Sequence, residues 1–178
     1  MLLTLYSYLS IDAATSVYNS FNIVIPAYSM IRIMTTPAPV SMTMTTSLAG
    51  ASISSVSNSN MYLQITSIVN PNKLRRITAK ISNSNIPVGT ILKLASAPCS
   101  YPATQGNFGA VISPAITLIK NVDLTIIDGI GSCYTSNGTT DGYNLTFSWQ
   151  PNGAQYNQLV GTGGPTNLTI MFTMADMP

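Results

Sequence analysis

Residues 145–149 read Leu-Thr-Phe-Ser-Trp, and residues 168–174 read Leu-Thr-Ile-Met-Phe-Thr-Met. In both stretches an apolar side chain recurs at every second position. Because successive side chains of a β-strand point to opposite faces, this period indicates strands with one buried face. The same period recurs in residues 17–25, 40–44, 61–65 and 77–81. Helical periodicity is nowhere sustained, so the chain is predicted to be all-β.

Turn-forming residues separate the expected strands, with Asn-Pro-Asn at 70–72, Asn-Gly at 137–138 and Asp-Gly at 141–142. Further short strands are expected at 30–34, 50–56, 91–97, 115–119 and 122–127, which gives about nine to eleven strands in all. We predict an antiparallel, immunoglobulin-like β-sandwich. Residues 13–178 are expected to form its single domain, and residues 1–12 an N-terminal extension.

The composition limits the chemistry that is available to the chain. Charged residues make up 7% of the 178 residues, there is no His, and all five acids are aspartates scattered along the sequence. A serine nucleophile needs a base within reach, and His and Glu commonly serve as general acids and bases. Two cysteines are also too few for a zinc site. We therefore expect no enzyme, no catalytic residue, no metal site and no cofactor.

Five of the seven cations lie between residues 73 and 93, namely Lys73, Arg75, Arg76, Lys80 and Lys93. A nucleic-acid-binding protein needs several phosphate contacts, and a net charge of +2 does not favour one. We expect the cations on the solvated face and turn of an antiparallel pair of strands, where charge discourages edge-to-edge pairing. No nucleic-acid partner is predicted.

Cys99 and Cys133 are the only cysteines. A disulfide between them would stabilise the fold by roughly 3 to 4 kcal/mol on the chain-entropy account, and such bonds persist in oxidising compartments. Two free buried thiols are the alternative. The disulfide reading favours an extracellular protein at a cell surface.

The N-terminal segment has the strand period, because Leu3, Leu5, Leu9 and Ile11 alternate with polar side chains. It is too short to span a membrane. Three interpretations are open: a strand of its own domain, a residual leader, or a donor strand that completes the sheet of a neighbouring copy. The four apolar residues are the candidate assembly residues.

Several aromatic residues could bind sugars, because exposed rings stack on the apolar faces of sugar rings. Trp149 continues the period of Leu145 and Phe147, so it is expected in the core. Tyr134, Tyr143 and Tyr156 are the candidate glycan contacts.

The sequence resembles two families of exported proteins. DGIGSCYT at 128–135, DGYNLTFSW at 141–149 and NLTIMFTM at 167–174 resemble the C-terminal half of small exported β-proteins of Gram-negative bacteria. In size, low charge and N-terminal pattern the chain also resembles fimbrial, pilin-like subunits, although its central cysteines and its C-terminus depart from theirs. The pilin resemblance implies filaments built by strand exchange between subunits.

These patterns together favour a structural role over a catalytic one. We expect a subunit of an extracellular, pilus-like filament that binds copies of itself by strand complementation. A secreted carbohydrate-binding or adhesive module is the alternative. A small viral capsid or decoration protein is a third reading, although the chain lacks the basic arm expected of a shell that packages nucleic acid.

Overall fold

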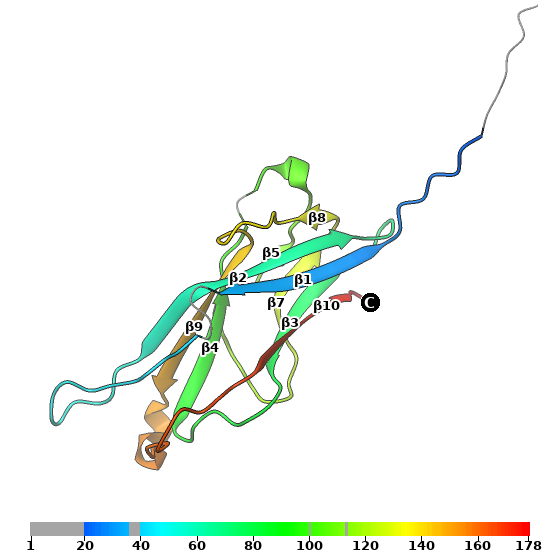
Figure 1. Ribbon diagram of the computed structural model, residues 1–178. Helices are drawn as coiled ribbons and strands as arrows, with labels where there is room; N and C mark the ends of the chain where they lie inside the picture. The colour runs from blue at the N-terminus through cyan, green and yellow to red at the C-terminus, as the bar shows by residue number, and fades with distance from the viewer. Residues whose placement is uncertain (1–19, 36–39, 100, 113) are drawn as a thin grey trace, which may run out of the picture.

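The computed structural model describes residues 20–35, 40–99, 101–112 and 114–178. These residues form ten strands and two 3-10 helices (Figure 1). In chain order the elements are β1 (Tyr28–Thr35), β2 (Val56–Ile68), β3 (Arg75–Ile81), β4 (Thr90–Ser96), η1 (Ala103–Gln105), β5 (Ala110–Val111), β6 (Ile116–Thr117), β7 (Leu124–Ile130), β8 (Cys133–Tyr134), β9 (Tyr143–Pro151), η2 (Gly153–Gln158) and β10 (Ile170–Asp176).

The strands form two sheets, and every pairing between them is antiparallel. The first sheet has the order β1-β2-β9-β4-β6, with β8 paired to β2, and the second has the order β10-β3-β7-β5. Apolar side chains from both sheets form one core, which includes Leu63 and Leu145 of the first sheet and Ile77 and Ile127 of the second. The predicted all-β antiparallel sandwich is confirmed.

The strands of the sandwich pair in a nested order, in which each pair encloses the next along the sequence. β2 pairs with β9, β3 with β7 and β4 with β6, and successive strands from β2 to β7 alternate between the sheets. A long hairpin rolled up in this way is the arrangement of a jelly roll. Immunoglobulin sandwiches keep hairpins of successive strands within one sheet, and among the described strands only β1 and β2 form such a hairpin. The connectivity is thus closer to a jelly roll than to the expected immunoglobulin-like order.

Three of the expected strands are absent from the described residues, and one of them, at 17–25, is described only from residue 20. Residues 20–25, 40–44 and 50–55 carry no strand, and of the strand expected at 50–56 only Val56 belongs to one, as the first residue of β2. The chain from 40 to 55 forms a long loop that leads into the start of β2 (Figure 1). Met42 still packs against the core. An alternating pattern specifies which side chains are buried but supplies no neighbouring strand, and none of the pairings between the described strands involves residues 40–55.

The cations of β3 do not protect a sheet edge, because β3 lies between β10 and β7. Lys80 forms an ion pair with Asp123 at 2.9 Å, and the Arg76 side chain lies 3.6 Å from Asp128. Both contacts thus join β3 to its neighbour: Asp128 lies in β7, and Asp123 directly precedes β7. The expectation of edge protection was wrong, because β3 is an interior strand whose Arg76 and Lys80 lie beside aspartates. The solvated position expected for Arg75 was also wrong, because Arg75 is buried, with 7% of its surface exposed.

Gly142 occupies a position that only glycine fits well. Its φ of +99° lies in the left-handed region, and a Cβ atom there would lie 2.3 Å from the Leu63 carbonyl oxygen. Its N–H donates to the Tyr101 hydroxyl at 2.7 Å. These constraints bring the start of β9 against β2.

We expect Gly142→Ala to lower the free energy of unfolding by about 2 kcal/mol or more, because it adds both backbone strain and a steric clash. Chemical denaturation measures the change. Gly153→Ala is the control, since no atom lies within 4 Å of its added Cβ, and it should stay within about 0.5 kcal/mol of the parent. Equal effects of the two substitutions would contradict this account of Gly142.

Candidate functional site

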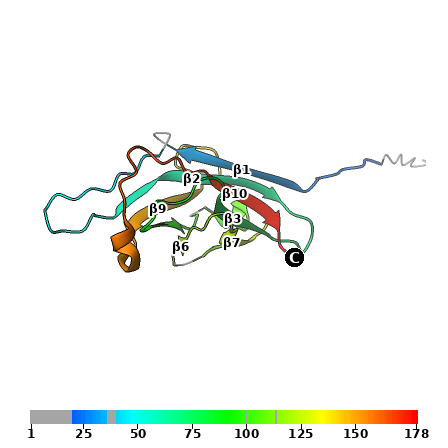
Figure 2. The ribbon, with the colours of Figure 1, turned by 90° about the horizontal axis from the view of Figure 1, so that it is seen from below.

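Among the described residues, each sheet ends in an edge strand on the same side of the sandwich. β1 is the end strand of the first sheet and β10 that of the second, and the two lie side by side in both views (Figures 1 and 2). An edge strand exposes the N–H and C=O groups of alternate residues, which are free to pair with another strand. The sandwich is therefore open between β1 and β10.

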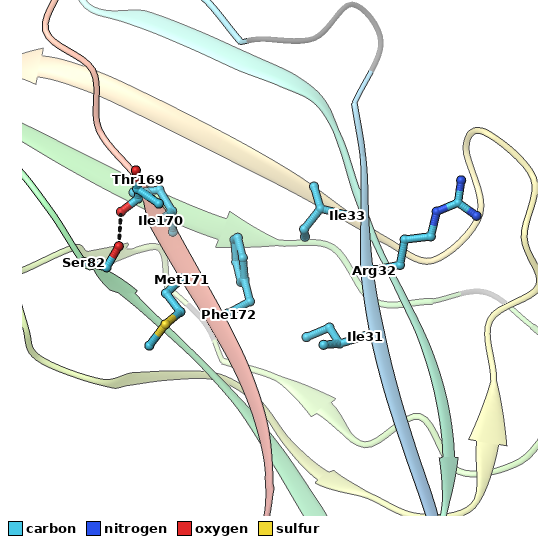
Figure 3. Close-up of a pocket in the computed structure, with 8 residues that line it drawn as sticks. All are labelled: Ile31, Arg32, Ile33, Ser82, Thr169, Ile170, Met171 and Phe172. Atoms are coloured by element: carbon cyan, nitrogen blue, oxygen red, sulfur yellow. Dashed lines mark hydrogen bonds between the residues drawn. The ribbon is translucent and has the colours of Figure 1, made fainter.

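A groove of about 300 Å³ lies between these two strands (Figure 3). Ile31 and Ile33 of β1 face Ile170 and Phe172 of β10 across it, whereas the Arg32 side chain points away. These four apolar side chains are only partly buried, although they pack against the core. The groove thus leaves apolar side chains that pack against the core partly exposed to solvent.

A buried arginine holds the two edge strands together at one end. Arg75, at the start of β3, is 7% exposed. Its Nε donates to Asp176 Oδ1 at 2.7 Å, and a terminal nitrogen donates to the Tyr28 carbonyl oxygen and, at 3.2 Å, to Ser67 Oγ. One side chain therefore bridges the start of β1 and the end of β10.

The start of β10 is held by hydrogen bonds to the two residues that follow β3. The N–H and the hydroxyl of Ser82 both donate to the Thr169 carbonyl oxygen, at 2.9 and 3.2 Å, and the Thr169 N–H donates to Asn83 Oδ1 at 2.6 Å. The hydroxyl contact is drawn in Figure 3. β10 is therefore anchored to β3 at both ends, while no other strand of the described residues pairs with its second edge.

The chain before β1 forms an extended arm. Residues 20–27 pair with no strand in the part of the chain that the structure describes, and they project away from the sandwich (Figures 1 and 2). Four apolar side chains of the arm lie almost entirely in solvent, with exposed fractions of 79% for Phe21, 86% for Ile23, 81% for Val24 and 75% for Ile25. The period-two pattern expected for residues 17–25 is present in the described part of this range, but it does not form a strand in the isolated chain.

The lining of the groove suits apolar binding rather than proton transfer. Its polar side chains are the hydroxyls of Ser82 and Thr169 and the outward-pointing Arg32. A groove with free backbone edges and apolar walls can accept an extended segment, because the backbone provides hydrogen bonds and alternate side chains enter the groove.

The predicted assembly residues Leu3, Leu5, Leu9 and Ile11 lie outside the described residues. The arm at 20–27 and the groove were not among the predicted site residues. Residues 30–34 were expected to form a strand, and β1 confirms that strand. Its position at an edge depends on pairings between distant parts of the chain, and local patterns do not show them.

The three candidate glycan tyrosines do not form one surface. Tyr143 is 1% exposed, and its hydroxyl donates to the Phe108 carbonyl oxygen, so the glycan prediction for Tyr143 was wrong. Tyr134, in β8, and Tyr156, in η2, are 49% and 40% exposed, but they lie at opposite ends of the molecule (Figure 1). The core position expected for Trp149 is partly realised, because it is half-buried and donates to Thr90 Oγ1 at 2.9 Å.

Cys99 and Cys133 are free thiols in this structure, which differs from the predicted disulfide and matches the alternative of two free thiols. Burial, reinforced by the neighbouring Cys133, raises the pKa of Cys99 from 9.0 to about 12, although a hydrogen bond with Tyr143 opposes the shift. Burial raises the pKa of Cys133 to about 11. It also raises the pKa of Tyr143. The two thiols are thus held in their neutral form.

No protein-family model, curated protein or solved structure matches this chain. The resemblance to exported β-proteins therefore remains a prediction from the quoted motifs, and the resemblance to pilins a prediction from size, low charge and the N-terminal pattern. Within the described ranges, no helix has the length and apolar character needed to cross a membrane. The same residues bring together no group of three or more His, Cys, Asp or Glu side chains that could hold a metal ion.

We expect Asp176→Asn to lower the free energy of unfolding by about 2 kcal/mol, because it leaves the buried Arg75 charge without its carboxylate. Asp123→Asn is the matched control. It removes the partner of Lys80 from a pair that is more open to solvent, with side-chain exposures of 22% and 49%, so the expected loss is below about 1 kcal/mol. Urea titration of both variants measures the difference. If Asp176→Asn left the free energy of unfolding unchanged, the stability of the buried Arg75 would not depend on this carboxylate.

Native protein at pH 8 should react with iodoacetamide about a hundredfold more slowly than unfolded protein, because the raised pKa values leave little thiolate. The folded state prefers the neutral thiol, so this contribution to stability is present below pH 9 and is lost as the pH rises towards 11 and 12. Mass spectrometry of alkylated protein provides the measurement. Unfolded protein that resists alkylation until it is reduced would show that the two cysteines are paired.

Proposed function

We propose that this chain is a structural subunit of an extracellular filament that assembles with copies of itself by strand complementation. The observation that carries the proposal is the arm at residues 20–27. It presents Phe21, Ile23 and Ile25 at every second position, each at least 75% exposed. An apolar, extended segment held away from its own domain needs a partner surface.

The energetics favour a partner for this arm. Fully burying an apolar side chain of this size is worth roughly 1.5 to 3 kcal/mol relative to leaving it in water. Backbone pairing along an open sheet edge adds to this and fixes the orientation of the segment. The free edges of β1 and β10 are also sites that proteins normally protect. Assembly removes both kinds of exposure in a single contact.

The symmetry of such a contact favours a polymer. An arm that binds a different surface on the next copy makes a heterologous contact, which produces an open filament unless its rotation closes into a ring. The pilin resemblance and the low charge of the chain are consistent with a filament. The extracellular, cell-surface location belongs to this proposal.

One observation favours a second candidate, a subunit of a closed shell. The nested strand order is that of jelly rolls, an architecture found in viral capsid domains. The same arm could join subunits in either assembly. The two candidates share the self-association and differ only in its geometry.

The full chain, purified without denaturant, is expected to form filaments that negative-stain microscopy detects, with a concentration-dependent assembled fraction in mass photometry. Closed particles would favour the shell. A chain that stays monomeric at all concentrations would contradict both candidates. Glycan-array binding by such a monomer, lost on changing Tyr134 or Tyr156, would favour the carbohydrate-binding alternative.

A further inference from the structure

We propose that the groove between β1 and β10 is the acceptor site for residues 20–27 of a second copy of this chain. This inference rests on the proposed function and specifies the contact through which the subunits assemble. In it, the arm lies as an added strand between the two sheet edges, with Phe21, Ile23 and Ile25 directed into the groove.

The side chains of the arm and the groove are complementary. In an extended chain Phe21, Ile23 and Ile25 point to one side, and Asn22 and Val24 to the other. The groove presents Ile31, Ile33, Ile170 and Phe172 as a partly exposed apolar lining. Neither surface has a charge to desolvate, because residues 20–27 carry none and Arg32 points out of the groove.

The lengths also agree. The eight residues of the arm span about 26 Å when extended, at roughly 3.3 Å per residue. β1 has eight residues and β10 has seven, so the arm and the two edge strands are of similar length, and the groove covers the part of those strands at residues 31–33 and 170–172. The free N–H and C=O groups of either edge can pair with the arm along this distance.

The arm cannot readily reach the groove of its own chain. It continues the line of β1 away from the sandwich (Figures 1 and 2), so binding to its own domain requires a reversal immediately before Tyr28. The favoured two-residue hairpin turns need residues with positive φ. Pro26 cannot adopt such a conformation, because its ring fixes φ near −65°. A second copy is therefore the occupant that the geometry favours.

The first test compares two substitutions on the arm of the full chain. Ile23→Asp places a charge in the groove, and we expect it to weaken assembly about tenfold or more in sedimentation velocity. Val24→Asp adds the same charge on the opposite side of the arm and should weaken assembly by less than about threefold. Both residues are more than 80% exposed, so neither change should alter the melting temperature of the monomer.

The second test locates the acceptor without assuming a register. A photoreactive benzophenone amino acid replaces Ile23 in an equal mixture of ¹⁵N-labelled and unlabelled full-length chains. After irradiation, mass spectrometry should find crosslinked peptides of mixed isotope composition that join position 23 to residues 31–33 or 170–172. Crosslinks within a single chain, or to another surface, would overturn the inference.

The outcomes separate this inference from the proposed function. A parent chain that never assembles defeats the proposed function. A parent chain that assembles, but responds equally to Ile23→Asp and Val24→Asp or crosslinks outside the groove, defeats only the arm-in-groove contact.

Discussion

The side of the sandwich that carries β1 and β10 depends on the buried guanidinium of Arg75. It donates to Asp176 of β10, to the backbone of Tyr28 in β1 and to Ser67 of β2, so one side chain joins both sheets where their edges meet. Because a buried charge is tolerated only when it is paired and hydrogen-bonded, these contacts fix the separation of the two edge strands. The groove between β1 and β10 opens beyond this point.

The nested jelly-roll pairs explain why this side is open. β2 pairs with β9 and β3 with β7, so β2 and β3 would themselves be the edges of the rolled hairpin. The chain extends each sheet by one further strand, β1 beside β2 and β10 beside β3. No strand within the described ranges pairs with the outer side of either added strand. The exposed groove is thus a product of the two segments that flank the roll.

The sequence predicted the parts of the fold that depend on local side-chain period. β2, β3, β9 and β10 all lie where apolar residues alternate, because one face of each strand must be buried. The same period did not produce strands at 20–25 or 40–44, where the described chain has no neighbour to pair with. It also could not show that Arg75 is buried or that Ile31 and Phe172 line one groove, since both facts arise from pairings between residues distant in the sequence.

The low charge of the chain affects how the proposed contact between the arm of one copy and the groove of another would form. Three of the four aspartates in the described residues lie within 4 Å of cations of β3, and neither the arm nor the groove lining adds a charge to the contact. Electrostatic steering, which accelerates association between oppositely charged surfaces, therefore has little to act on. The hydrophobic contribution remains, and excluded salts such as sulfate strengthen it rather than screen it. The proposed self-association through the groove would consequently depend on shape, strand pairing and apolar burial.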